Sequence, residues 1–185
     1  MDVAVLGAAS PGSEIAQVCA AAGHEVSLYD DGANAVMDAV DAIEGRLPDG
    51  SEDVVDRLSA TTGFEAAVSD ATVVVEATTA DATALQERFA DIEEVAGREA
   101  LLGASATGVS VTAAAAGLRH PDRAVGLRFR DPLDAPLVEV TVADQTTGET
   151  ADRARQFVAG IDRTPVVVRD APGGVSTRAA LALEA

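Results

Sequence analysis

The sequence predicts an α/β fold: a doubly wound, largely parallel sheet with helices on both faces. Short runs rich in Val, Leu and Ile alternate with stretches of helical periodicity along nearly all of the 185 residues. Alternating strands and helices are typical of βαβ units, whose strands lie parallel. Hydrophobic residues make up 48% of the chain and aromatic residues only 3%, which favours the aliphatic core of a buried parallel sheet. We expect a single domain over residues 1–185, because no linker, repeat or low-complexity tract interrupts the pattern.

Each predicted element follows from a local pattern. The apolar run VAVLG predicts a buried strand near the N-terminus, and ATVVVEA is the clearest run of this kind. Gly23 ends the first predicted helix, and a Pro/Gly turn at residues 47–53 ends the second. Strands are expected at residues 3–7, 25–29, 71–77, 100–104, 124–129, 137–142 and 165–169. Helices are expected at residues 13–22, 33–44, 82–95, 111–117 and 149–159, with a short amphipathic piece at 54–58 and a terminal helical stub within 173–185.

The charge of the chain excludes some classes of partner. The formal net charge is −18, and every one of the 13 basic residues is arginine. A field of this sign disfavours binding to nucleic acid and to anionic membranes. The acidic residues are spread along the whole chain, so we interpret them as an acidic, halophilic-type surface rather than a functional acidic patch.

The cysteine count, the N-terminal residues and the length of the apolar runs predict the cellular compartment. Cys19 is the single cysteine, so no internal disulfide can form and a reducing compartment fits. A strand is predicted at once from residue 3, with no basic segment and apolar core of a signal peptide before it. The apolar runs are far shorter than the ~20 residues that a membrane span needs. We therefore expect a soluble, cytoplasmic protein without membrane contact.

The turn after the first predicted strand has the pattern of a phosphate-binding loop. It reads GAASPG over residues 7–12 and leads directly into a helix. Gly7 would permit the tight turn, and Gly12 would allow the helix to pack closely on the strand. Ser10 is predicted as the N-cap with Pro11 in the first helical position, which would direct free backbone N–H groups at a pyrophosphate.

A carboxylate follows the second predicted strand at the spacing that a dinucleotide site requires. Asp30 lies about 20 residues beyond the loop, where it would bind the ribose hydroxyls of NAD and repel the extra phosphate of NADP. Two residues depart from the pattern. Ala9 replaces the middle glycine, and Glu14 adds negative charge to the first helical turn. The alternative interpretation is an inherited turn that no longer holds a cofactor.

These features, in their order, resemble the NAD-binding domain of 3-hydroxyacyl-CoA dehydrogenases, from residue 2 to about residue 181. The resemblance is carried by five blocks, at residues 3–30, 73–77, 126–132, 136–140 and 164–178. It implies a Rossmann-type fold, an NAD cofactor and an acyl-CoA-type ligand. It also implies an oxidoreductase of fatty acid metabolism that transfers hydride between NAD and a 3-hydroxyacyl-CoA.

The resemblance breaks at the catalytic positions. The histidine that takes the hydroxyl proton in the family falls on Arg128, while its partner glutamate is kept as Glu139. The family's serine falls on Thr107, and its asparagines fall on Asp131 and Thr177. An arginine stays protonated and cannot accept a proton, so we expect impaired catalysis with Glu139, Thr107 and Arg128 lining the cleft.

Other predictions concern single residues. Arg128 either forms an ion pair with Glu139, or holds a substrate carbonyl or anion together with Arg130 and Arg178. The family's acidic and lysine cofactor contacts fall on Ala80 and Leu85. The two histidines and one cysteine lie far apart in the sequence, so no metal site is expected.

Several functions remain open at this point. Enzymes of the family continue into a helical domain that supplies the acyl-CoA groove and the dimer contacts, whereas this sequence stops at residue 185. The chain is then a weakly active dehydrogenase, a non-catalytic NAD(H)-binding regulatory or partner-binding domain, or one half of a split dehydrogenase. Its partner would be a second copy in a homodimer or a separate helical-domain chain.

Overall fold

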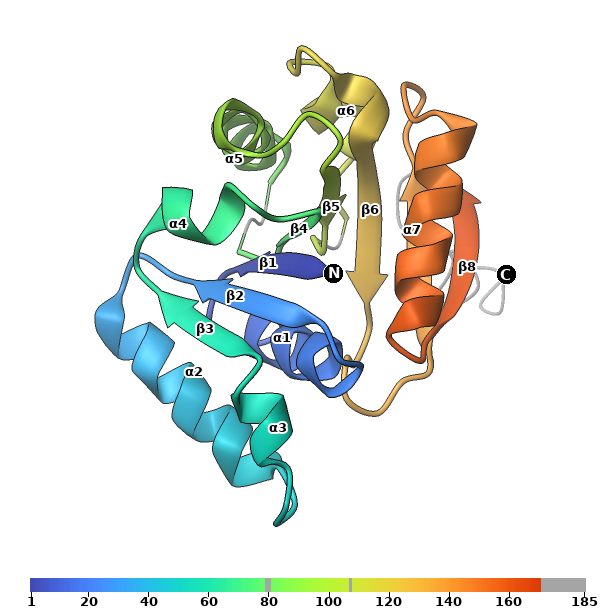
Figure 1. Ribbon diagram of the computed structural model, residues 1–185. Helices are drawn as coiled ribbons and strands as arrows, with labels where there is room; N and C mark the ends of the chain where they lie inside the picture. The colour runs from blue at the N-terminus through green and yellow to red at the C-terminus, as the bar shows by residue number, and fades with distance from the viewer. Residues whose placement is uncertain (79–80, 107, 171–185) are drawn as a thin grey trace.

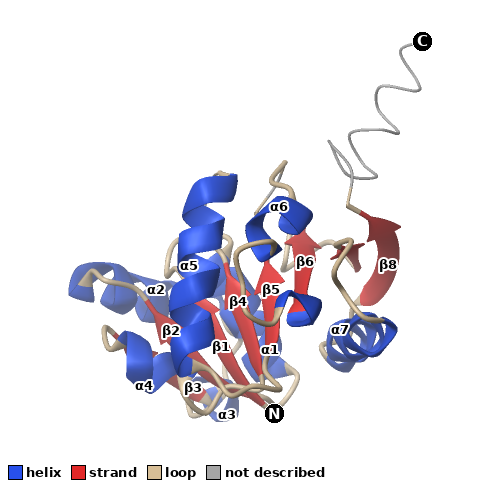
Figure 2. Cartoon of the chain, turned by 90° about the horizontal axis from the view of Figure 1, so that it is seen from above, coloured by secondary structure: helices blue, strands red, loops and turns tan. Residues whose placement is uncertain are grey.

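The computed structural model describes residues 1–78, 81–106 and 108–170, and within them the chain forms one eight-stranded sheet (Figures 1 and 2). The strand order is β3-β2-β1-β4-β5-β6-β7-β8. The strands are β1 (Asp2–Leu6), β2 (Glu25–Tyr29), β3 (Leu58–Thr61), β4 (Val73–Glu76), β5 (Leu101–Ala104), β6 (Ala124–Phe129), β7 (Leu137–Val142) and β8 (Thr164–Arg169). The helices are α1 (Gly12–Ala21), α2 (Ala33–Arg46), α3 (Glu52–Val55), α4 (Phe64–Val68), α5 (Ala82–Val95), α6 (Val111–Ala115) and α7 (Gly148–Gly160), with a 3₁₀ turn at Pro121–Arg123.

The topology is doubly wound and largely parallel, as the alternation of strands and helices predicted. Strands β1 to β6 all run parallel to one another, whereas β7 pairs antiparallel to β6, and β8 pairs parallel to β7. The chain order reverses between β1 and β4, because β2 and β3 extend the sheet on one side and β4 to β8 extend it on the other. Crevices at such a switch point are where open α/β sheets bind ligands.

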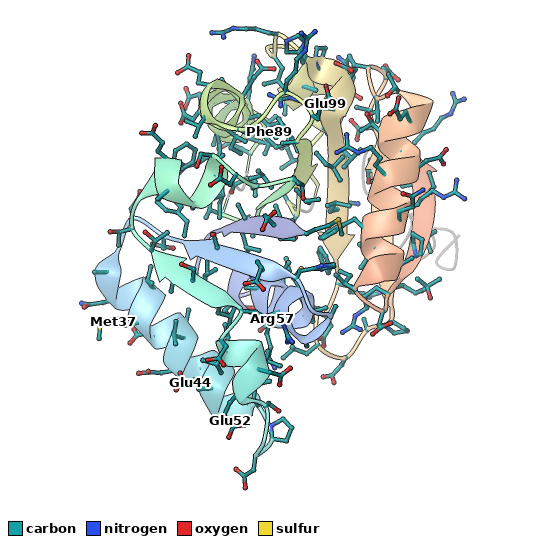
Figure 3. All side chains as sticks on the ribbon, in the orientation of Figure 1. Met37, Glu44, Glu52, Arg57, Phe89 and Glu99 are labelled. Carbon is teal, nitrogen blue, oxygen red and sulfur yellow. The ribbon has the colours of Figure 1, made fainter. Side chains whose placement is uncertain are left out.

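Two apolar layers cover the sheet, one on each face. Val3 and Val5 of β1 face α1, α2, α3 and α7, whereas Ala4 and Leu6 face α4, α5 and α6. This division follows from the two-residue repeat of a strand. Figure 3 shows Phe89 between α5 and the sheet, while acidic side chains such as Glu44 and Glu52 project outward from α2 and α3. Along the described segments, none of the helices combines the length and apolarity needed to cross a bilayer.

The region between α2 and β4 differs from the prediction. The amphipathic piece expected at residues 54–58 is divided between α3 and β3, and neither β3 nor α4 was predicted. Strand β3 is an edge strand with the sequence LSAT, in which Leu58 and Thr61 are half-buried and the two residues between them are exposed. It therefore lacks the apolar alternation from which a strand is predicted. The helical stub expected within 173–185 lies outside the described residues.

Candidate functional site

The turn after β1 is packed too tightly for side chains at its two glycines. Gly7 has a φ of +107°, and its N–H donates to the carbonyl oxygen of Tyr29 at 2.8 Å. A Cβ atom at Gly7 would overlap Cγ2 of Thr78, and one at Gly12 would overlap the carbonyl oxygen of Gly7. The predicted roles of the two glycines in the turn and in helix packing are confirmed, while their role in cofactor binding stays a prediction.

The start of α1 corrects the prediction for Ser10 and Pro11. The helix begins at Gly12 and its N-cap is Pro11, with no side-chain capping bond, so Ser10 is not the cap. The reason is that the turn closes on itself, since the N–H of Gly12 donates to the carbonyl oxygen of Ala9 at 2.7 Å. Within the described residues the N–H groups of Ser13 and Glu14 have no hydrogen-bond partner, so these two remain the donors of the helix terminus.

Asp30 joins the turn to the end of β2. Its Oδ2 accepts the N–H of Ala8 at 3.0 Å, and its Oδ1 accepts the N–H of Gly32 at the same distance. Each carboxylate oxygen has a second lone pair, so the group can accept further hydrogen bonds. The carboxylate therefore lies beside the glycine turn, and its binding to ribose stays a prediction.

A cavity of about 560 Å³ opens at the carboxyl ends of the parallel strands. One wall is the turn and first helical residues, with Ser10, Pro11 and Glu14, and the others are the segments after β4 and β5 and residues 129–132 after β6. Ala9 of the turn is exposed and is not among the residues that line this cavity. The cavity lies at the switch point of the sheet, where a ligand would meet the N-terminus of α1.

Arg128 and Glu139 form an ion pair, the first of the two alternatives that the sequence left open for Arg128. They are paired residues on the antiparallel strands β6 and β7, with Arg128 Nη1 2.6 Å from Glu139 Oε1. Each side chain is only 12% exposed, and the hydroxyl of Thr141 donates to the same Oε1 at 3.4 Å. The guanidinium charge is thus largely neutralised within the sheet.

A second cavity, of about 290 Å³, borders Arg128 on the side of α6. Asp144 and Asp170 also line it, and Asp170 Oδ2 accepts the hydroxyl of Ser110 and the N–H of Thr112, both at 2.8 Å. Two carboxylates beside an already paired arginine give this cavity no net positive charge. This charge balance argues against the interpretation of Arg128 as an anion-holding electrophile.

The remaining predicted residues are not brought into one constellation. Leu85 is fully buried in α5, so it cannot replace a cofactor contact. Asp131 is exposed after β6, and its Oδ1 accepts the N–H of Asp134 at 3.2 Å. In the described residues no group of three His, Cys, Asp or Glu side chains could hold a metal ion. Ala80, Thr107, Thr177 and Arg178 lie outside the described residues.

Glu76 is a residue whose role sequence reasoning missed. It ends the apolar strand β4, is fully buried, and accepts the N–H and the hydroxyl of Thr78, the former at 2.6 Å. Arg88 approaches it at 3.7 Å and also covers the ring of Phe64 at 5.7 Å. The carboxylate thus shapes the turn that packs against Gly7. The sequence held a sign of this role, because Glu76 is the single charged residue in the apolar run VVVEA.

Two buried ionisable groups, Cys19 of α1 and Tyr29 of β2, are unsuited to proton transfer or nucleophilic attack at neutral pH. Burial raises the pKa of the Cys19 thiol to about 12, so it stays protonated in the core. Burial, together with the hydrogen bond that its hydroxyl donates to Asp31, raises the pKa of Tyr29 above its ordinary value of 10.0. Neither residue supplies a base for chemistry in the cleft.

The fold and the glycine turn define a dinucleotide-binding protein of the Rossmann type. The model of the family "3-hydroxyacyl-CoA dehydrogenase, NAD binding domain" matches residues 2–171, and the chain belongs to this family. Among curated relatives, the 3-hydroxyadipyl-CoA dehydrogenase of Escherichia coli K12 is 32% identical over 189 residues, which cover 96% of this chain and 40% of that protein. The 3-hydroxybutyryl-CoA dehydrogenase of Clostridioides difficile is 26% identical, with 96% and 67% covered.

The comparison with solved structures also finds 3-hydroxyacyl-CoA dehydrogenase-type proteins. The crystal structure of 3-hydroxybutyryl-CoA dehydrogenase from E. coli K12 matches with a TM-score of 0.90 and 31% identity, over 97% of this chain and 40% of that one. Prephenate dehydrogenase from Aquifex aeolicus, at 17% identity and a TM-score of 0.68, shares the fold alone. The chain therefore corresponds to about two fifths to two thirds of the length of the curated relatives described above.

Proposed function

We propose that this chain binds NAD in the cleft at the switch point and acts as the nucleotide-binding part of a 3-hydroxyacyl-CoA dehydrogenase-type oxidoreductase. The observation that carries the proposal is the placement of Asp30, which is hydrogen-bonded to Ala8 beside the Gly7 turn. The residues present fit the cofactor, because the turn has no side chain at either glycine and Ser13 and Glu14 retain N–H donors. Bound NAD would supply the hydride acceptor.

Asp30 also sets a preference between the two nicotinamide cofactors. A carboxylate can accept hydrogen bonds from the two ribose hydroxyls of NAD, but it repels the ribose phosphate of NADP. In the described residues no arginine forms an ion pair with Asp30. NADH should therefore bind more tightly than NADPH.

Oxidation of a 3-hydroxyl also needs a base for the hydroxyl proton, and residue 128 does not provide one. The guanidinium of Arg128 is paired with the carboxylate of Glu139 at 2.6 Å across β6 and β7, and a guanidinium cannot accept a proton. A positioned general base contributes typically about 10²–10⁴-fold to the rate. Turnover of 3-hydroxyacyl-CoA should be weak for this reason.

The same ion pair favours a second candidate function, a non-catalytic NAD(H)-binding domain that regulates or joins a partner. Such a domain needs the turn, Asp30 and the cleft, but no base. A split dehydrogenase would differ from it by gaining activity when its missing half is added.

Calorimetric titration with NAD, NADH and NADPH tests the proposal, followed by an assay of acetoacetyl-CoA reduction. Asp30→Asn should weaken NADH binding by about tenfold and reduce the preference over NADPH, because a charged hydrogen-bond partner is lost. Asp38→Asn, an exposed change on α2, is the matched control and should leave both affinities unchanged. Binding without turnover supports the non-catalytic domain, turnover above background supports the dehydrogenase, and absence of binding refutes the proposal.

A further inference from the structure

We propose that Arg130 is a phosphate-binding side chain of the cleft, which donates hydrogen bonds to the pyrophosphate of the dinucleotide from the wall opposite α1. This inference rests on the proposed function and names a residue that the family resemblance does not supply. It follows from the position of the side chain, the support of its backbone and the charges around it.

Arg130 directly follows β6 and lines the 560 Å³ cavity together with Ser10, Pro11 and Glu14 of the opposite wall. Its side chain is exposed, and it makes no hydrogen bond or ion pair with any described residue. It is also the one cation among the residues that line this cavity, all of which lie in the described ranges. Its neighbour Arg128, by contrast, is bound to Glu139 in the sheet.

The backbone that carries Arg130 is held in place by other polar contacts. Arg163 Nη2 donates to the carbonyl oxygen of Pro132 at 2.8 Å. The N–H of Ala135 donates to the carbonyl oxygen of Asp131 at 2.9 Å, and the N–H of Asp134 donates to the carboxylate of Asp131 at 3.2 Å. The turn is thus fixed. Asp131 also lines the cavity, and one oxygen of its carboxylate accepts the N–H of Asp134 within the same turn. Arg130 is the cation of this wall, and its side chain makes no bond that fixes it elsewhere among the described residues.

The opposite wall, at the start of α1, offers a phosphate fewer free N–H donors and more negative charge than the glycine-turn pattern indicated. The N–H of Gly12 is used by Ala9, and Glu14 places a carboxylate in the first turn of α1, where negative charge competes with a bound anion. The net charge of −18 adds a general repulsion. A guanidinium across the cavity offsets these effects, because its planar fork donates two hydrogen bonds to phosphate oxygens.

The test is a titration of the full chain with NADH, followed by fluorescence or calorimetry, for the wild type and three variants. Arg130→Gln should weaken NADH binding by about tenfold or more, and Arg130→Lys should recover part of the loss, because a point charge remains without the fork. Arg155→Gln on α7, whose side chain pairs with Asp152, removes the same charge elsewhere and should leave the affinity within about twofold of the wild type.

The outcomes separate this inference from the proposed function. If the wild type does not bind NADH, the proposed function fails. If it binds and Arg130→Gln binds equally well, Arg130 is not a ligand and the inference is wrong. An acyl-CoA also carries phosphate groups, so a parallel titration uses acetoacetyl-CoA. If Arg130→Gln weakens the binding of acetoacetyl-CoA but not that of NADH, the assignment to the dinucleotide is wrong. Circular dichroism of each variant checks that the fold is retained.

Discussion

The Arg128–Glu139 pair should contribute to stability mainly as a unit, and a double-mutant cycle measures this. Both side chains are 12% exposed and meet at 2.6 Å across β6 and β7. Removing one partner of a largely buried pair leaves a charge in a poorly solvated position, which costs about 3–5 kcal/mol, whereas apolar replacement of both is often close to neutral. We expect Glu139→Leu to cost about 3 kcal/mol, and the double variant Arg128→Met with Glu139→Leu to cost about 1 kcal/mol or less.

The assay is urea unfolding followed by circular dichroism, with a thermal scan as the second measurement. For a chain of this size, 3 kcal/mol corresponds to a fall in Tm of about 6–12 °C. The coupling energy between the two positions should be about 2 kcal/mol or more. If the single and double variants were additive, the pair would contribute no coupling, and the interpretation of Arg128 as a structural replacement of the family's histidine would be refuted.

Two further predictions concern pH and salt. Burial by itself raises the pKa of the Glu93 carboxyl. The opposite effects are larger together, because the N–H groups of Arg119 and His120 donate to the carboxylate and Arg123 lies close to it. The pKa of Glu93 is therefore below its ordinary value of 4.5. This carboxylate therefore stabilises the fold above about pH 4.5 and the contribution is lost as the pH falls through the lower folded-state pKa. The difference in unfolding free energy between the wild type and Glu93→Gln should shrink over that range, and a constant difference would contradict the assignment. Raising NaCl from about 0.1 M to 1 M should raise the urea midpoint, because the Debye length falls from about 10 Å to 3 Å and screens the repulsion of the acidic surface. An unchanged midpoint in NaCl would argue against the halophilic-type interpretation.

The order of strands and helices could be predicted because most elements carry a strong local pattern. The bounds predicted for α5, β6 and β7 agree with the structure, since each is a long periodic run between clear breaks. Strand β3 could not be predicted, because an edge strand with exposed central residues has no core-facing alternation. Helix α4 was missed for a related reason, since its five residues, Phe64–Val68, are too short to show helical periodicity.

The candidate site was predictable to the extent that it depends on chain order. The turn at residues 7–12 and the position of Asp30 follow from the strands that precede them, and the hydrogen bond from Ala8 brings Asp30 beside this turn. The cap at Ser10 was wrong because the hydrogen bond from Gly12 to Ala9 closes the turn first, which depends on backbone geometry that composition does not show. The cavity wall carrying Arg130 could not be derived either, since it requires the contact between distant parts of the chain.

The last prediction asks whether residue 128 alone limits activity. Arg128→His would place an imidazole on β6 opposite Glu139, whose carboxylate could then accept its ring N–H and orient it. If NADH and acetoacetyl-CoA both reach the cleft, the reduction rate should rise by about 10²-fold or more over the wild type, because a general acid and base is restored. The control is Arg128→Gln, which removes the same charge without supplying a titratable group and should give no rise. If Arg128→His binds NADH as the wild type does yet stays inactive, the missing base is not the limiting factor, and the substrate-binding surface must be sought outside the segment that this chain shares with its relatives.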